Sequence, residues 1–351
     1  MTGKETLILS IDAMGGDNAP RCIIEGVSMV AKDHPGELFF FLFGDEAKLI
    51  PIISEVGLDP KCYKIHHTTD FVRADAKPAQ ILRSGRETSM WKAIMAVRNG
   101  YAKAVVSAGN TGALMAMSKI CLGTLQGIDR PAIAGILPSA NGPIVMLDLG
   151  ANAKCDPQNL VEFSLMGEVL YHVLFNEEKP SIGLLNIGSE ETKGREEIRE
   201  AAAILHEMGD KINYYGFVEG NDISAGKTNV VVSDGFSGNI ALKTIEGAAK
   251  FIAKALKQEV KGSWISMFGF LMAHSSLSKF KKKFDPRIYN GAMFLGLKGI
   301  SVKSHGGTDA YGFSCAIEAA IKMARQDICE KTKNEIATVL NMSALDDTTA
   351  P

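Results

Sequence analysis

Glycines and small polar residues follow seven short apolar runs of this 351-residue chain. The segments after the runs are Asp12-Ala-Met-Gly-Gly-Asp-Asn, Gly44-Asp45, Ser107-Ala-Gly-Asn-Thr-Gly112, Asp148-Leu-Gly-Ala-Asn152, Asn186-Ile-Gly-Ser-Glu190, Ser233-Asp-Gly-Phe-Ser-Gly-Asn239 and Ser304-His-Gly-Gly-Thr308. Glycine lets backbone N–H groups approach a ligand, and Ser, Thr and Asn add neutral donors. A surface of this kind suits a phosphate or a developing oxyanion.

The alternative is that these residues only form turns, as Gly and Asn commonly do. One such segment would not decide the matter. The carboxyl ends of strands are where open α/β sheets bind their ligands. We therefore expect the seven segments to lie at the same edge of a sheet, around a common cleft.

Other catalytic motifs are incomplete or do not occur in the sequence. Gly220–Thr228 resembles a P-loop, but five residues instead of four separate its glycines, and a strand follows it. No Gly-x-Gly-x-x-Gly opens a helix after the first strand, and no Gly-x-Ser-x-Gly is present. His66 and His67 are adjacent on a predicted strand and would point to opposite faces, which suits no single metal ion. The residues favour chemistry by positioning and charge stabilisation, with no metal and no cofactor.

The elements that position these residues alternate between strands and helices. The predicted strands are Leu7–Ile11, Leu38–Phe43, Ala104–Ala108, Ile144–Leu149, Ile182–Ile187, Asn229–Asp234 and Ile300–Ser304. Most are continuously apolar, as in strands buried on both faces of a largely parallel sheet. Asp156-Pro157 predicts the start of one helix, and apolar residues at steps of three and four from Leu242 to Val260 predict another. The pattern predicts an α/β fold with three layers, helices on both sides of a sheet.

We expect residues 1–330 to form one large α/β catalytic domain, or two lobes, with a protruding helical segment at about 245–290. The tail at 331–351 loses its pattern, and we expect it to be frayed.

The composition limits the class of protein. A formal net charge of −2 gives the chain as a whole no basic excess for binding nucleic acid. The six cysteines are scattered, without a Cys-x-x-Cys pair, as in proteins of a reducing compartment. Neither a signal peptide nor an apolar run long enough to span a membrane is evident, so we expect a cytoplasmic protein.

The segment from Trp264 to Arg287 combines aromatic residues with a cluster of lysines. One interpretation is a loop or helix tip that packs on a partner subunit. The other is an interfacial segment whose apolar side chains enter the lipid headgroup region while the lysines meet anionic lipid. The candidate membrane-contact residues are Trp264, Phe268, Phe270, Leu271, Lys281 and Lys282.

Seven sequence blocks resemble a known family. They are IDAMGGDNAP, VVSAGNTGALMA, LDLGANAKCDP, GLLNIGSEETKG, FVEGNDI, VVVSDGFSGNIALKTIEG and KSHGGTDAYGF. Their order is that of bacterial phosphate acyltransferases, the acyl-acyl-carrier-protein:phosphate acyltransferases of phospholipid synthesis. The resemblance runs from about Leu7 to Ala324. The chain reads NIGSEETKG where the family usually has NIGEExxKG, and SHGGTD where HGSS is more usual.

The resemblance implies transfer of a long-chain acyl group from acyl carrier protein to inorganic phosphate, giving acyl phosphate for phosphatidic acid. It also implies the fold of phosphotransacetylases and isocitrate-type dehydrogenases, and a homodimer. The implied location is the inner face of an anionic membrane, with peripheral contact to a downstream glycerol-phosphate acyltransferase. A basic patch should meet the acidic carrier protein, and Lys77, Arg83 and Arg86 are candidates.

The resemblance makes Lys193 and Asn239 the candidate catalytic pair, with Asp234 either orienting Lys193 or ending its strand. Lys193 would offset the charge repulsion between phosphate and the oxyanion, to which Asn239 would donate a hydrogen bond. The remaining candidates for binding substrate or phosphate are Asp12, Gly15, Gly16, Asn18, Ser107, Asn110, Thr111, Asn152 and His305. The plainer interpretations are a solvated lysine, a first-turn helix residue and ordinary turn residues.

Two other functions fit parts of the sequence. A phosphate acetyltransferase would use coenzyme A and a short acyl group. A scaffold on the membrane surface would recruit enzymes of lipid synthesis through Trp264–Arg287, but it would not need so many polar residues at strand ends.

Overall fold

One sheet of eleven strands runs through the computed structural model, which describes residues 6–261, 272, 275, 287 and 290–339. The strand order is β3-β2-β1-β4-β11-β10-β5-β6-β9-β7-β8. The strands are β1 (Leu7–Asp12), β2 (Leu38–Gly44), β3 (Tyr63–His67), β4 (Ala104–Ser107), β5 (Ala132–Ser139), β6 (Gly142–Leu147), β7 (Ile182–Leu185), β8 (Tyr214–Val218), β9 (Val230–Val232), β10 (Ala292–Leu295) and β11 (Ile300–Lys303).

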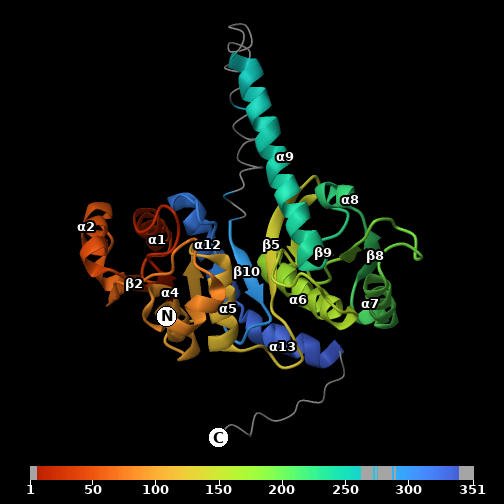
Figure 1. Cartoon of the computed structure of the whole chain (residues 1–351), viewed down its shortest axis with the longest axis horizontal. Helices are drawn as coiled ribbons and strands as arrows, with labels where there is room; N and C mark the ends of the chain where they lie inside the picture. Colours follow the sequence, from red (N-terminus) through yellow and green to blue (C-terminus); the bar gives the residue numbers. More distant parts are fainter. Residues whose placement is uncertain (1–5, 262–271, 273–274, 276–286, 288–289, 340–351) are drawn as a thin grey trace, which may run out of the picture.

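Helices cover both faces of the sheet, which gives the predicted three-layer α/β fold (Figure 1). The helices on one face are α1 (Arg21–Asp33), α2 (Glu46–Val56), α6 (Pro157–Phe175), α7 (Glu196–Glu207), α12 (Ala310–Arg325) and α13 (Ile328–Val339). Those on the other face are α3 (Pro78–Ser84), α4 (Ser89–Arg98), α5 (Thr111–Leu122), α8 (Gly220–Ala225) and α9 (Gly235–Lys261). Alternate residues of β2 enter the two apolar cores, Phe40 and Leu42 on one face and Phe41 and Phe43 on the other. The continuously apolar runs are therefore strands buried on both faces, as predicted.

The sheet contains two groups of parallel strands that run in opposite directions. β3, β2, β1, β4 and β11 are parallel to one another, and so are β6, β9, β7 and β8. Between the groups, β10 is antiparallel to β11 and β5, and β5 is antiparallel to β6. The carboxyl ends of the two groups therefore lie at opposite edges of the sheet.

Local signals account for several helix starts. The Asp156 carboxylate accepts a hydrogen bond from the backbone N–H of Asn159, and the side-chain oxygen of Asn159 accepts one from the backbone N–H of Asp156. This capping box starts α6 where Asp156-Pro157 predicted it. The P-loop-like segment forms α8 and ends at Gly226, which has φ +68°. It precedes β9, so it is not a strand-to-helix phosphate loop.

The expectation of a frayed tail from residue 331 is wrong for residues 331–339. They belong to α13, which packs on α6 and buries Ile328, Thr332, Ile336 and Val339. These residues recur every three or four positions and so form one helix face. Residues 340–351 lie outside the described part of the chain.

Helix α9 projects from the body of the molecule (Figure 1). Its first turns carry Leu242 and Ile245 against the sheet, whereas Phe251, Ile252 and Leu256 are exposed. The candidate membrane residues Trp264, Phe268, Phe270, Leu271, Lys281 and Lys282 lie outside the described residues. Among the described helices, none is long and apolar enough to cross a bilayer.

Candidate functional site

A pocket of about 410 Å³ opens at the carboxyl ends of β1, β4 and β11. It is lined by Met14, Gly16, Asp17, Phe71, Val72, Ala74, Ala108, Gly109, Asn110, Thr111, Gly112, Lys303 and Gly306. Four segments far apart in the sequence thus meet at the pocket, and some residues predicted to bind phosphate lie among them. Gly16, Asn110 and Thr111 are the members of that set that line the pocket.

Two adjacent glycines let the loop after β1 approach the loop after β4. A Cβ atom at Gly15 would lie 2.5 Å from Asp12 Oδ2 and 2.7 Å from the backbone N of Gly109. Gly16 has φ +109°, and a Cβ there would lie 2.9 Å from the Cβ of Ala108. A side chain at either position would push the two loops apart, so the glycine pair sets the floor of the pocket.

Asp12 and Ser107 lie beneath this floor and are fully buried. The hydroxyls of Ser89 and Ser107 each donate to the Asp12 carboxylate at 2.6 Å. Burial raises the pKa of Asp12, while these two hydrogen bonds oppose the rise. Asp12 and Ser107 therefore support the pocket from behind, and the structure does not place them among its lining residues.

The side chain of Asn110 holds one wall of the pocket in place through hydrogen bonds. Its side-chain oxygen accepts from the N–H of Ala113 and caps α5. Both protons of its amide group are used, one by the carbonyl of Ala74 at 2.8 Å and one by that of Ala76 at 3.2 Å. The first N–H groups of α5, from Thr111 and Gly112, have no acceptor within the helix and lie at the pocket with the positive end of the helix dipole.

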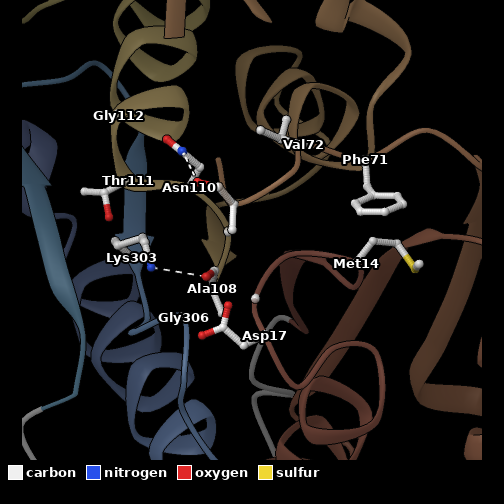
Figure 2. A pocket seen from close by; sticks show the side chains of 13 residues that line it. Met14, Asp17, Phe71, Val72, Ala108, Asn110, Thr111, Gly112, Lys303 and Gly306 are labelled. Atoms are coloured by element: carbon white, nitrogen blue, oxygen red, sulfur yellow. Dashed lines mark hydrogen bonds between the residues drawn. The ribbon is translucent and has the colours of Figure 1, made fainter. Parts of the chain in front are cut away.

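Lys303 ends β11 in the wall of the pocket and is only 6% exposed. Its ammonium group donates to the carbonyl of Ala108 at 3.2 Å and to that of Ser304. Burial lowers its pKa to about 8, although the charges of Asp12 and Asp17 oppose the shift. Figure 2 shows the Lys303 side chain with its hydrogen bond to the carbonyl of Ala108.

The opposite wall is apolar. Met14 and Val72 are buried, and Phe71 is 44% exposed. Figure 2 shows Phe71 and Met14 on the side of the pocket away from Lys303 and Thr111. One half of the pocket thus offers charge and N–H groups, and the other offers apolar surface.

Asn18 and His305 belong to the same edge of the sheet but do not line the pocket. The amide of Asn18 donates to the carbonyl of Thr308 at 2.9 Å. The imidazole of His305 accepts from the N–H of Gly307 at 3.2 Å. Both contacts hold the loop after β11 in shape.

The candidate catalytic residues form a second cluster, after β7 and β9. Lys193 is exposed in the loop between β7 and α7, and Asn239 is half-buried in the first turns of α9. The amide of Asn239 donates one proton to the carbonyl of Leu149 at 2.9 Å. The carboxylate of Asp234 binds Arg195 and accepts from the N–H of Ser237 at 2.7 Å. Of the two expected roles of Asp234, orienting Lys193 or ending its strand, the structure does not show the first, because the Asp234 carboxylate pairs with Arg195.

Asn152 supports the turn after β6. One carboxylate, Asp148, accepts from the backbone N–H groups of Ile133, Gly150, Ala151 and Asn152. The amide of Asn152 donates to Asp148 at 3.0 Å and to the carbonyl of Pro131 at 2.9 Å, which uses both of its protons. Asn152 thus has no amide proton left for phosphate, and it lies at the edge of the sheet opposite the pocket.

The expectation that all strand ends meet at one edge is wrong. The pocket lies at the carboxyl ends of β1, β4 and β11, and the Lys193–Asn239 cluster lies at those of β6, β7 and β9. The antiparallel strands β10 and β5 separate the two sets and reverse the strand direction. Within one chain, the strand ends around the pocket and those around Lys193 and Asn239 do not meet.

Exposed apolar side chains surround the second cluster. Ile187 is 80% exposed in the loop of Lys193, Phe236 is 64% exposed beside Asp234, and Ile240 follows Asn239 and is half exposed. Apolar groups gathered on a surface mark an interaction site.

Sequence reasoning missed Lys303, Phe71 and Arg195. The signal for Lys303 was a single cation at the end of an otherwise apolar run, Ile300–Ser304. Arg195 follows the block that contains Lys193, and nothing in its spacing distinguishes it from a surface residue. Within the described residues, no three His, Cys, Asp or Glu side chains are grouped as a metal site requires.

Comparison with known proteins gives the family. Residues 7–331 match the family model described as "Fatty acid synthesis protein". The chain is 50% identical over 337 residues to the phosphate acyltransferase of Rhodospirillum rubrum, covering 96% of each chain. It is 50% identical over 327 residues to that of Paramagnetospirillum magneticum, covering 93% of each.

Solved structures agree on the fold. A phosphotransacetylase from Streptococcus pyogenes superposes with a TM-score of 0.62 at 17% identity, over 92% of this chain and 94% of that one. The EutD phosphotransacetylase from Staphylococcus aureus gives a TM-score of 0.58 at 14% identity, with the same coverage. The family model and the relatives at half identity settle the matter, and the chain belongs to the phosphate acyltransferase family.

Proposed function

We propose that this phosphate acyltransferase takes a long-chain acyl group from acyl carrier protein and transfers it to inorganic phosphate. The products would be acyl phosphate and the free carrier protein thiol. The observation that carries the proposal is the pocket with one polar and one apolar side, because one substrate is a polar anion and the other carries an apolar chain. Phosphate needs N–H groups and positive charge, and a fatty acyl thioester needs apolar surface.

The polar side would receive phosphate at the start of α5. The N–H groups of Thr111 and Gly112 face this side together with the positive end of the helix dipole. Gly16 keeps the floor clear of side-chain atoms. This arrangement orients a phosphate oxygen for direct attack on a carbonyl carbon.

The apolar side would receive the acyl thioester along Met14, Phe71 and Val72. The loop that carries Phe71 and Val72 leads into α3, and the exposed residues Lys77, Arg83 and Arg86 follow it in sequence. Their positive charge suits an acidic carrier protein. A carrier protein bound there would deliver its acyl chain next to the apolar wall.

A homodimer would complete the site. Lys193 and Asn239 lie at the edge of the sheet opposite the pocket, so they cannot act on a substrate in the pocket of their own chain. The exposed apolar side chains of Ile187, Phe236 and Ile240 around them favour burial against another protein surface. Two copies related by a twofold axis would place Lys193 and Asn239 of the partner subunit at each pocket.

The reaction would need no covalent enzyme intermediate. A phosphate oxygen attacks the thioester carbonyl carbon, the new C–O bond forms, and the C–S bond breaks. The thiolate leaves and takes up a proton. Asn239 has one amide proton besides the one it gives to Leu149, and this proton would bind the oxyanion. Lys193 would offset the charge of phosphate and oxyanion.

A direct assay tests the reaction. Palmitoyl-acyl carrier protein and phosphate are incubated with the full chain, and hydroxylamine-sensitive acyl phosphate is measured. Lys193→Ala and Asn239→Ala should each lower kcat by about 10²–10³-fold. A preference for acetyl-coenzyme A would support the acetyltransferase alternative, and near wild-type rates in both variants would contradict the assigned roles.

Subunit mixing tests the shared site. Thr111→Trp should fill the pocket and Lys193→Ala should remove the cation, so each variant alone is inactive. Denaturing and refolding an equal mixture should restore about a quarter of wild-type activity, because half of the dimers are mixed and each has one intact site. An inactive mixture that contains folded mixed dimers would show that the site does not extend across subunits.

Peripheral membrane association is a separate proposal. Phe251, Ile252 and Leu256 are exposed on the part of α9 that leads toward Trp264–Arg287. Vesicles with and without anionic lipid should separate the apolar and charge contributions in a flotation assay. Unchanged flotation after replacement of the aromatic residues of Trp264–Arg287 by serine would contradict it.

A further inference from the structure

Lys303 is a buried cation that opens onto the pocket. Buried lysines are rare unless they are paired with a carboxylate. Among the ion pairs of the described residues, none joins Lys303 to Asp12, to Asp17 or to another carboxylate. A charge kept in such a place requires a further explanation.

Within the described residues, the hydrogen bonds of Lys303 use two of its three ammonium N–H groups. An ammonium group has three N–H donors. Two of them meet the carbonyls of Ala108 and Ser304, and these backbone groups fix the position of Nζ. Within the described part of the chain, the third donor has no protein acceptor, and Lys303 lines the pocket.

A purely structural role for Lys303 is the alternative. Such a lysine would neutralise Asp12, which lies beneath the pocket. Asp12 already accepts from Ser89 and Ser107 at 2.6 Å and from the N–H of Met14 at 3.4 Å. The charge of Lys303 lowers the pKa of Asp12 in the same direction as these hydrogen bonds. Asp12 is thus stabilised mainly by hydroxyl groups, and the charge of Lys303 remains available to a ligand.

We propose that Lys303 binds the attacking phosphate directly, with its third N–H donor on a phosphate oxygen and the first turn of α5 on the others. The inference rests on the proposed function for the identity of the anion. It adds a phosphate-binding residue in the same chain as the pocket, distinct from Lys193. A buried ammonium without an ion pair gains more from a bound anion than an exposed one, because water does not screen the contact.

The same burial makes anion binding depend on pH. The pKa of Lys303 is lowered to about 8 by burial, so a bound anion should raise it and the protein should take up a proton on binding. The charged groups that act on Lys303 are Asp12 at the end of β1 and Asp17 in the loop after it. His305 follows in the loop after β11, with its ring turned to the N–H of Gly307.

Asp17 provides a matched control of opposite sign. It lines the pocket and its carboxylate lies near Gly306 and Gly307. A carboxylate there opposes an incoming phosphate by like-charge repulsion. At pH 6, where Lys303 stays protonated, Asp17→Asn should therefore strengthen anion binding, whereas Lys303→Met should weaken it.

The experiment measures binding of inorganic phosphate and of sulfate to the full chain by calorimetry, without any acyl donor. Sulfate stays doubly charged between pH 6 and pH 9, so changes in its affinity report on the protein. Lys303→Met should lower the affinity for both anions at least tenfold, since hydrogen bonds to charged groups are the strong ones. Wild-type affinity for sulfate should fall as the pH rises through about 8, and the profile of Lys303→Met should be flat there.

The outcomes separate the alternatives. Titrations in buffers of different ionisation enthalpy should show proton uptake with sulfate at alkaline pH in the wild type and none in Lys303→Met. Unchanged affinity in a folded Lys303→Met would overturn the proposal. If that variant fails to fold, a flat wild-type profile or weaker binding in Asp17→Asn at pH 6 would overturn it instead. Lys303-dependent anion binding without acyl phosphate formation would leave this inference standing and refute the proposed function.

Discussion

The guanidinium of Arg195 binds the buried carboxylate of Asp234, and this contact ties the loop of Lys193 to the start of α9, where Asn239 lies. Asp234 is 1% exposed at its side chain and Arg195 is 53% exposed. The ion pair therefore joins a buried carboxylate to a guanidinium group at the surface. It fixes the relative position of two elements whose side chains are proposed to act together.

Replacing Arg195 by Ala should lower kcat more than it lowers stability. The exposed end of the pair is screened by water, so we expect a loss of about 1 kcal/mol in the free energy of unfolding. Misplacement of Lys193 relative to Asn239 should reduce kcat by about tenfold or more. Denaturant unfolding and steady-state kinetics measure the two effects.

A double-mutant cycle gives the control for this pair. Arg195→Ala, Asp234→Asn and the double variant should be non-additive in kcat, since each single change already breaks the link. Additive losses would mean that the two residues act independently.

The close approach of two loops at Gly16 should make this position intolerant of a side chain. Gly16→Ala places a methyl group 2.9 Å from the Cβ of Ala108 at φ +109°. The expected cost is on the order of 1–3 kcal/mol of stability, with a higher KM for phosphate because the floor of the pocket shifts. Thermal unfolding and phosphate titration of the rate measure both.

Gly36→Ala is the matched control. Gly36 also has a positive φ, +74°, but no atom lies within 4 Å of a Cβ built there. It should lose some stability and keep the KM for phosphate. If Gly16→Ala behaves in the same way as Gly36→Ala, the contact with Ala108 has no role in the site.

Local patterns in the sequence were enough to predict β1, α6 and three residues of the pocket lining. The apolar run before Asp12 predicts the strand β1, and three of the residues predicted to bind phosphate, Gly16, Asn110 and Thr111, line the pocket. These features depend on residues close together in sequence, such as a cap or a pair of glycines, so the pattern alone reveals them.

The reversal of strand direction within the sheet could not be predicted in this way. It depends on β10, which has four residues, and on β5, which contains Gly135 and Pro138 and so lacks a clear strand pattern. Strand pairing depends on residues far apart in the sequence, so a single apolar run does not determine which strand it pairs with. Without the antiparallel pairing of β10 and β5, the sequence predicts that Lys193 and the candidate phosphate-binding residues lie at the same edge of the sheet. The position of Lys303 was missed for a similar reason, because its surroundings come from β1, β4 and α5.

The exposed aromatic ring of Phe71 should select for long acyl chains. Phe71→Ala removes apolar surface from one wall of the pocket, so kcat/KM should fall more for a C16 acyl donor than for a C8 donor, by about tenfold. The ratio of the two kcat/KM values on carrier protein thioesters measures the effect. Tyr101→Ala is the control, since Tyr101 is 64% exposed before the start of β4, at the other edge of the sheet. An equal loss for both chain lengths would show that Phe71 acts on something other than the acyl chain.

Glu168 should make the protein less stable as the pH rises. It lies on α6, and burial together with the charge of Glu335 on α13 raises its pKa to about 7. One of its carboxylate oxygens is buried without a hydrogen-bond partner. In the unfolded chain the group ionises near pH 4.5, so the folded state binds the extra proton between these values. Stability is therefore highest below about pH 4.5 for this group and is lost as the pH rises through about 7.

Glu168→Gln should remove this loss, because the amide stays neutral at every pH. At pH 8 the variant should be more stable than the wild type by about 3 kcal/mol, and below about pH 4.5 the two should be alike. Denaturant unfolding across pH 4–8 measures the difference. Glu330→Gln, an exposed position on α13, should leave the slope unchanged. If Glu168→Gln and Glu330→Gln have the same slope as the wild type, the packing of α13 on α6 does not disfavour a charge at Glu168.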